Sequence, residues 1–168
     1  MMKQSRFHLY LILFPLLYLI HDIEEILTVE KFLIEHSDII PFRVTTLEFT
    51  VAFLLLWVLA SVGCYQAFQG RKFLGMKPGT YLSFLVPGVI LANAVGHILP
   101  CLIFKEYVPG IITSIFILVP YSFFTARFLI TMGEVTVKKQ ITYFVIGFAA
   151  QMPLAFLAHI VSSNIVKW

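Results

Sequence analysis

Charged side chains are scarce in this chain: they make up 12% of its 168 residues, whereas hydrophobic side chains make up 60%. Ordinary soluble domains carry about twice that charged fraction, and the mean hydropathy here is +0.92. This composition excludes an ordinary soluble domain and predicts a membrane protein. The net charge of +3 is small and is spread over several polar segments, so we expect no nucleic-acid partner.

Cysteines and nucleotide-binding motifs are also missing or rare. The two cysteines, Cys64 and Cys101, lie in different apolar segments and form neither a CxxC pair nor a zinc-finger spacing. The sequence contains no GxGxxG or P-loop motif, which argues against a nucleotide cofactor.

The first apolar run lacks the small residues of a signal-peptide cleavage site. No Ala, Gly or Ser occurs between Phe7 and Leu27, so we expect a helix that stays in the protein. The fourteen residues from Phe7 to Ile20 rise only about 21 Å, whereas the hydrocarbon core is about 30 Å thick. A spanning helix must therefore continue through the polar residues that follow.

Long apolar runs predict five transmembrane helices in a single all-α domain over residues 1–168. Each of the four later runs has about 22 residues or more, which is enough to cross a bilayer. Eight basic residues near the helix ends fall on the side of the N-terminus and four on the other side, which favours an N-in, C-out orientation. The predicted helices cover residues 7–27, 47–68, 80–104, 107–130 and 141–166.

The end of the first apolar run carries four ionisable side chains: His21, Asp22, Glu24 and Glu25. On a helix His21, Glu24 and Glu25 share one face, because they are three and four residues apart. Asp22 is expected to turn away from that face. The spacing therefore places an imidazole and two carboxylates around a common point.

Other polar side chains are expected at the same depth in the membrane. In the five-helix topology His21, His97 and His159 lie about 21, 25 and 27 Å from the inner boundary, at 1.5 Å per residue. Glu48 and Tyr107 lie at the outer ends of their helices. The polar groups therefore gather near the outer membrane face.

The sequence contains three short motifs in this order: His21-Asp22-Ile23-Glu24-Glu25, Asn93-Ala94-Val95-Gly96-His97 and Tyr107-Val108-Pro109-Gly110. Together they resemble the motifs of the HXXEE-domain family of small bacterial membrane proteins. The resemblance covers roughly residues 10–125 and implies a multi-pass protein of the bacterial plasma membrane, whose molecular function is not established.

Imidazole and carboxylate groups are the usual ligands of zinc, iron and manganese, and catalytic zinc sites use three protein ligands with a water. We predict that His21, Glu25 and His97 bind a divalent metal, zinc first, with iron or manganese as alternatives. By analogy with the His-x-x-Glu-His motif of inverzincins, Glu24 is the candidate general base. The candidates for alternative ligands or orienting groups are Glu48, Asn93, His159 and Tyr107.

Three functions fit these residues. The first is a metal-dependent membrane hydrolase acting on a lipid or another apolar small molecule. The second is a carrier that couples proton or cation movement to transport of a small solute, since ionisable groups within membranes often serve that purpose. The third is a metal-free scaffold in which the polar groups form a hydrogen-bonded knot. A metal site requires that the three predicted ligands meet.

Overall fold

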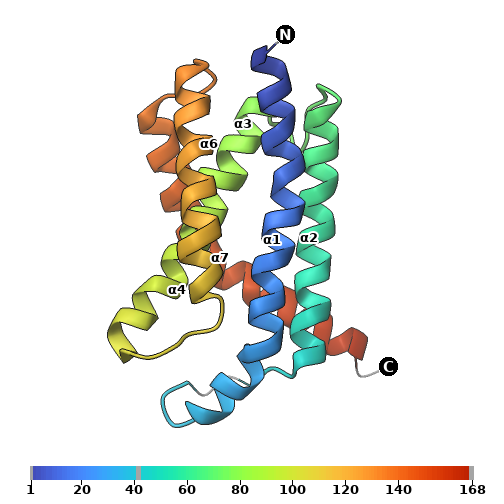
Figure 1. The fold of residues 1–168 in the computed structure, drawn as a ribbon. Helices are drawn as coiled ribbons and strands as arrows, with labels where there is room; N and C mark the ends of the chain where they lie inside the picture. The colour runs from blue at the N-terminus through green and yellow to red at the C-terminus, as the bar shows by residue number, and fades with distance from the viewer. Residues whose placement is uncertain (1, 41–42, 167–168) are drawn as a thin grey trace.

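A computed structural model describes residues 2–40 and 43–166. Over these residues the chain is helical and contains no strand, apart from one isolated bridge between Phe73 and Met76 in a turn. The helices pack side by side as elongated rods (Figure 1). The all-α fold predicted from composition is confirmed for this part of the chain.

The first two helices form an antiparallel pair. α1 (Met2–Glu35) and α2 (Thr46–Phe68) pack against each other along their length (Figure 1). The indole Nε1 of Trp57 on α2 donates a hydrogen bond of 2.8 Å to the carbonyl of Pro15 on α1. A capping box starts α2: the Thr45 hydroxyl accepts from the amide of Glu48, whose carboxylate accepts from the amide of Thr45, which satisfies two amides at the helix end.

The next two rods each contain a wider helical turn next to a proline. One rod consists of α3 (Pro78–Ser83), the π-helix η1 (Phe84–Ile90) and α4 (Leu91–Phe104). The other consists of α5 (Ile111–Thr113), the π-helix η2 (Ser114–Leu118) and α6 (Val119–Thr131). Pro87 lies within η1, and Pro120 lies two residues after the end of η2. Because proline has no amide proton, a local π-turn re-pairs the carbonyl that it leaves without a donor.

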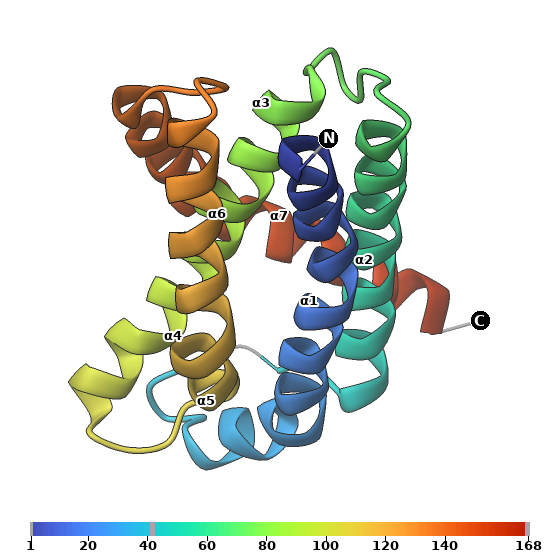
Figure 2. The ribbon, with the colours of Figure 1, turned by 45° about the horizontal axis from the view of Figure 1, so that its top comes forward.

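The last helix, α7 (Val137–Val166), crosses the third rod at close range and also contacts α2 (Figure 2). A Cβ atom on Gly147 would lie 2.9 Å from the carbonyl carbon and oxygen of Gly88. The two glycines therefore let the backbones of α7 and η1 touch, as is common where small residues line a membrane helix interface.

Buried apolar side chains from α1, α3, η1 and α6 meet in the centre of the bundle. Tyr121 on α6 donates a hydrogen bond of 2.6 Å to the carbonyl of Tyr10, and Ser122 donates one of 3.3 Å to the carbonyl of Val86. These bonds tie α6 to both neighbouring rods. The largest fully buried apolar side chains are Leu11, Phe14, Leu82, Val86, Ile90, Leu118 and Leu129.

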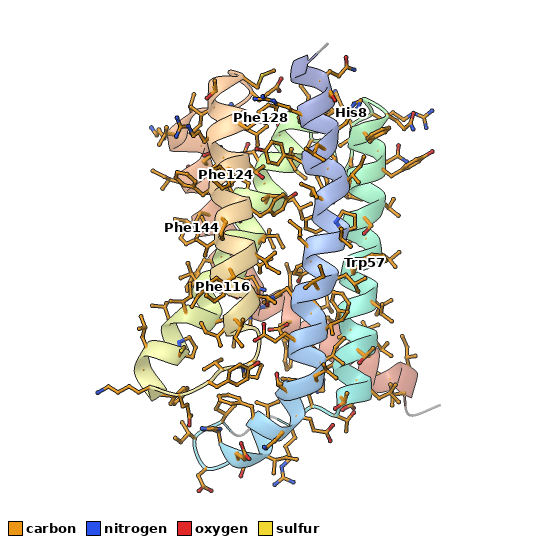
Figure 3. All side chains as sticks on the ribbon, in the orientation of Figure 1. His8, Trp57, Phe116, Phe124, Phe128 and Phe144 are labelled. Atoms are coloured by element: carbon orange, nitrogen blue, oxygen red, sulfur yellow. The ribbon has the colours of Figure 1, made fainter. Side chains whose placement is uncertain are left out.

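The outside of the bundle is apolar. Phe116 is 74% exposed and Phe124 56% exposed, and both project from the fourth rod in Figure 3. Among the described residues, four helices are long and apolar enough to cross a membrane, which suggests a membrane protein. These helices are Thr46–Phe68, Pro78–Phe104, Ile111–Thr131 and Val137–Val166.

The prediction of five transmembrane helices is therefore wrong in one respect, because α1 is not among the four. Its acidic residues interrupt the apolar run, and the helix continues in polar sequence to Glu35 instead of ending at Leu27. The fourth predicted helix starts at Ile111, not Tyr107, because Gly110 has a left-handed φ of +78°, where a helix cannot continue. The N-in, C-out orientation stays a prediction.

Candidate metal centre

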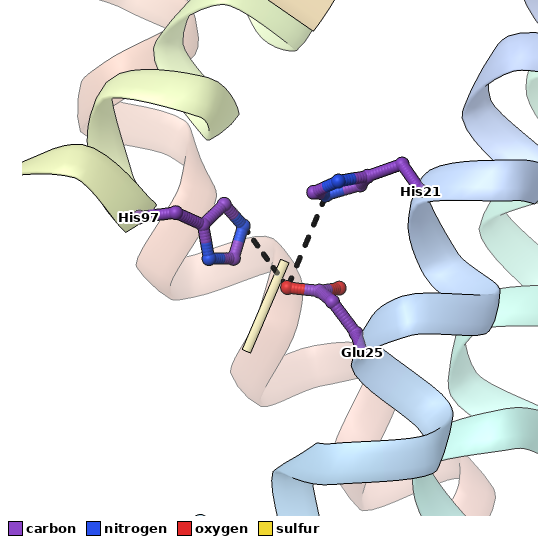
Figure 4. Close-up of side chains that lie close together, drawn as sticks. All are labelled: His21, Glu25 and His97. Carbon is purple, nitrogen blue, oxygen red and sulfur yellow. Dashed lines mark ion pairs between the residues drawn. The ribbon is translucent and has the colours of Figure 1, made fainter. Parts of the chain in front are cut away.

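The three predicted metal ligands come together. One turn of α1 presents His21 and Glu25, and α4 presents His97 toward them (Figure 4). The Oε1 atom of Glu25 lies 2.9 Å from Nε2 of His97 and 4.0 Å from Nε2 of His21. One ligand atom from each residue lies within 4.8 Å of the other two. Two imidazoles and a carboxylate thus converge from helices that are far apart in sequence.

The backbone of the loop between α4 and α5 closes one side of this group. A Cβ atom on Gly110 would lie 2.8 Å from Cε1 of His21 and 3.0 Å from Cγ of Glu25. Gly110 also has a φ of +78°, which side chains other than glycine rarely adopt. The glycine is therefore required both by the turn and by its contact with two predicted ligands.

His21 is fully buried and hydrogen-bonded at both ring nitrogens. Its Nδ1 lies 2.8 Å from Oγ1 of Thr113, and its Nε2 lies 2.9 Å from Nδ2 of Asn93. The ring of Tyr18 stacks on it at a centroid distance of 6.0 Å. These contacts from three helices fix the plane of the imidazole.

Glu24 caps the helix that starts at α5. Its Oε1 accepts hydrogen bonds from the Tyr107 hydroxyl at 2.8 Å and the Ile112 amide at 3.2 Å. Its Oε2 accepts from the amide and the hydroxyl of Thr113, at 2.8 and 2.6 Å. First-turn amides have no partner within their own helix, so a carboxylate from α1 satisfies two of them.

These four bonds use the lone-pair positions of the Glu24 carboxylate. To act as the general base predicted from the sequence, Glu24 would have to give up one of them. Its geometry is that of a residue that joins α1 to α5 and positions its neighbours.

His97 is the ligand closest to Glu25. Besides its contact with Glu25 through Nε2, the ring makes a hydrogen bond to the backbone of Pro109. The rings of His21 and His97 meet edge to face, with centroids 5.1 Å apart. Both Nε2 atoms therefore lie near Oε1 of Glu25, although Nε2 of His97 makes no hydrogen bond of good geometry.

We compared the chain with known protein families. The family model described as a protein of unknown function with HXXEE motif matches residues 12–125. The chain belongs to the HXXEE family. The family's motif is formed by His21, Glu24 and Glu25, and the match extends over His97 and Thr113. No curated protein and no solved structure matches the chain.

Asp22, within the HXXEE motif, differs from expectation. Its position on the helix predicted that its side chain turns away from His21, Glu24 and Glu25. Asp22 is instead only 2% exposed, and its carboxyl group interacts with that of Glu25. Oδ2 of Asp22 has no hydrogen-bond partner. The motif thus brings three acidic side chains, and not two, next to His21.

The remaining candidates divide into two pairs. Asn93 bonds His21 and Tyr107 bonds Glu24, so both belong to the network around the centre. Glu48 belongs instead to the capping box of α2, and His159 lies on α7 outside the group of three ligands. The family match ends before His159 as well.

Sequence reasoning missed Thr113. Its hydroxyl touches both His21 and Glu24, but a threonine in an apolar run carries no signal by itself. The one available hint was its place three residues after Gly110, in the first turn of a helix whose amides need acceptors.

A second link ties the two loops at this end of the bundle. His36 follows α1, and its Nε2 pairs with the carboxylate of Glu106, which follows α4. The hydrogen bond between Nδ1 of His36 and the carbonyl of Phe32, helped by Glu106, raises the pKa of His36 above its ordinary value. Protonated His36 therefore strengthens the connection.

Proposed function

We propose that this HXXEE protein binds a divalent transition-metal ion, zinc first and iron or manganese next, through His21, Glu25 and His97. The supporting observation is the convergence of their ligand atoms within 4.8 Å. Two histidines and one glutamate are also the protein ligands of many catalytic zinc sites. Such a set leaves a further coordination position for water or another small ligand.

The distances suit a metal ion after a small adjustment. Ligand atoms at about 2.0–2.1 Å from a tetrahedral zinc lie about 3.3 Å from each other. The distances from Oε1 of Glu25 to the two Nε2 atoms, 2.9 and 4.0 Å, lie on either side of that value. Shifts of less than about 1 Å in side chains that already face one another would produce the tetrahedral spacing.

The surroundings of the ligands also support a metal site. Histidines that bind metals commonly donate their other ring N–H to a carbonyl or carboxylate, which fixes the ring. The Pro109 backbone supplies such a partner to His97. An apolar bundle around the group limits access of bulk water, which strengthens the attraction between a cation and a carboxylate.

We propose metal binding alone, without hydrolysis. Hydrolysis of an apolar substrate would in addition require a base, and the lone pairs of Glu24 are used by four hydrogen bonds. We propose the bacterial plasma membrane as the location of the protein, and the resemblance of its motifs and its four apolar helices support this proposal. The centre lies where α5 contacts α1, at one end of the bundle (Figure 2).

Metal content tests the proposal directly. The full chain is purified in mild detergent, loaded with zinc and passed through a desalting column, and bound zinc is measured by elemental analysis. The test variants are His21→Ala, Glu25→Ala and His97→Ala. The matched control is His8→Ala, since His8 lies on α1 but packs against Phe68 near the N-terminal end (Figure 3).

We expect about one zinc per chain in the wild type and in His8→Ala, and loss of tight binding in the three test variants. Circular dichroism and size-exclusion chromatography of each variant show whether the bundle remains folded. A folded wild type that keeps no stoichiometric zinc would overturn the proposal. Folded ligand variants that keep the same zinc would also overturn it.

A further inference from the structure

The Thr113 hydroxyl lies between the carboxylate of Glu24 and the predicted metal ligand His21. The proton in each of these two hydrogen bonds can be assigned to its donor. Glu24 accepts four hydrogen bonds and donates none. A threonine hydroxyl has one proton to donate. That proton points to Oε2 of Glu24, because the contact of 2.6 Å between the two oxygens needs a proton and a carboxylate has none to donate. The Gly110 carbonyl is farther away, at 3.3 Å.

The neighbouring contact then has a defined direction. Since the proton of Thr113 is used on Glu24, Oγ1 of Thr113 must accept the hydrogen bond of 2.8 Å from Nδ1 of His21. His21 therefore carries a proton on Nδ1. Neutral imidazole has only one ring proton, so Nε2 keeps its lone pair.

The other side of the ring agrees with this assignment. Nδ2 of Asn93 lies 2.9 Å from Nε2 of His21, and an amide N–H donates to a lone pair. Nε2 of His21 also lies 4.0 Å from Oε1 of Glu25. A metal ion bound there would replace the Asn93 hydrogen bond at the same lone pair.

We propose that Thr113, held by Glu24, is a positioning residue that keeps His21 in the Nδ1–H tautomer, so that the Nε2 lone pair can bind the metal in place of the Asn93 amide. This inference rests on the proposed metal-binding function. It adds to that function the requirement for a hydroxyl group at position 113 and gives Glu24 an orienting role.

The test compares two substitutions that differ in the hydroxyl group. Thr113→Val keeps the side-chain shape and the backbone amide that caps on Glu24, whereas Thr113→Ser keeps the hydroxyl. The matched control is Thr125→Val on α6: Thr125 is also a threonine within a helix of this bundle, and it is fully buried, but its hydroxyl donates to the Tyr121 carbonyl, away from the centre. All variants are prepared as the full chain in detergent.

Two readouts separate positioning from folding. Zinc affinity is measured by competition with a chromophoric chelator. The tautomer of His21 is measured without metal, by ¹⁵N NMR of protein labelled at histidine, and its signals are assigned by their loss in His21→Ala.

We expect Thr113→Val to lose about 10- to 100-fold in zinc affinity, the usual effect of removing a group that orients a ligand. In the metal-free protein its His21 signal should move toward the Nε2–H tautomer. Thr113→Ser and Thr125→Val should keep the wild-type affinity and the wild-type tautomer.

The outcomes distinguish this inference from the proposed function. If the wild type binds zinc and Thr113→Val shows the same affinity and the same tautomer, the inference fails while the metal site stands. If the wild-type His21 carries its proton on Nε2, the inference fails whether or not the protein binds zinc. If the wild type binds no zinc, the proposed function fails, and the role of Thr113 in metal binding fails with it.

Discussion

Replacing Gly110 by alanine introduces a side chain where the structure has room for none. The new Cβ would lie 2.8 Å from Cε1 of His21 and 3.0 Å from Cγ of Glu25, whereas non-bonded carbons prefer about 3.5–4.0 Å. The left-handed φ of +78° adds about 1–2 kcal/mol for a residue with a Cβ. Overpacking of this kind costs about 1–3 kcal/mol. We therefore expect a total loss of about 2–5 kcal/mol in the free energy of unfolding.

Gly133→Ala is the matched control for the backbone part of this effect. Gly133 has a similar φ of +72°, but nothing lies within 4 Å of its would-be Cβ. Titration with a denaturing detergent, followed by circular dichroism, should give a larger loss for Gly110→Ala than for Gly133→Ala, and only Gly110→Ala should also weaken zinc binding. Equal losses of stability together with unchanged zinc affinity would refute the close contact between this loop and the centre.

Two further predictions concern links near the centre, and a third concerns the crossing of α7 and η1. The hydrogen bond to the Phe32 carbonyl, together with Glu106, raises the pKa of His36. The stabilising effect of the pair of His36 with Glu106 is therefore complete below pH about 6.5 and is lost as the pH rises through the raised pKa. The difference in melting temperature between wild type and Glu106→Gln should shrink from pH 5 to pH 8, and a difference independent of pH would contradict this. Tyr107→Phe removes one hydrogen bond to Glu24 and should cost about 0.5–1.5 kcal/mol in unfolding free energy. An unchanged unfolding free energy would contradict this prediction. Gly147→Ala places a Cβ 2.9 Å from the backbone of η1 and should cost about 1–3 kcal/mol, and wild-type stability would be evidence against the close helix crossing.

Gly96→Ala is the control for the helix-crossing prediction. A Cβ at Gly96 meets only the side-chain oxygen of Gln151, at 3.2 Å, which can move aside. Its effect on unfolding should therefore be much smaller than that of Gly147→Ala, although both glycines lie in apolar helices.

The helices follow from apolar runs because a membrane helix must bury its backbone hydrogen bonds within itself. The ends were harder to predict. α1 continues through polar residues to Glu35, and composition alone does not mark that extension. The helix begins only at Ile111, because Gly110 before it has a left-handed conformation. The sequence Pro109-Gly110 alone is equally compatible with a helix start or a turn.

The centre could be predicted in part. The spacing of His21 and Glu25 places them on one helical face, and the depth of His97 brings it to the same level. Depth does not define the direction in which a side chain points, which explains why His159, expected at a similar depth, lies outside the group. Contacts such as that of Thr113 depend on how two rods face each other, which helical periodicity within one rod does not specify.

X-ray absorption at the zinc K-edge of the loaded, desalted protein tests the metal centre most directly. We predict a first shell of nitrogen and oxygen at about 2.0–2.1 Å with no sulfur at about 2.3 Å, and with outer-shell scattering from two imidazole rings that falls to one ring in His97→Ala. Zinc bound with the same imidazole scattering in wild type and His97→Ala, or a wild type that retains no zinc, would contradict a centre formed by His21, Glu25 and His97.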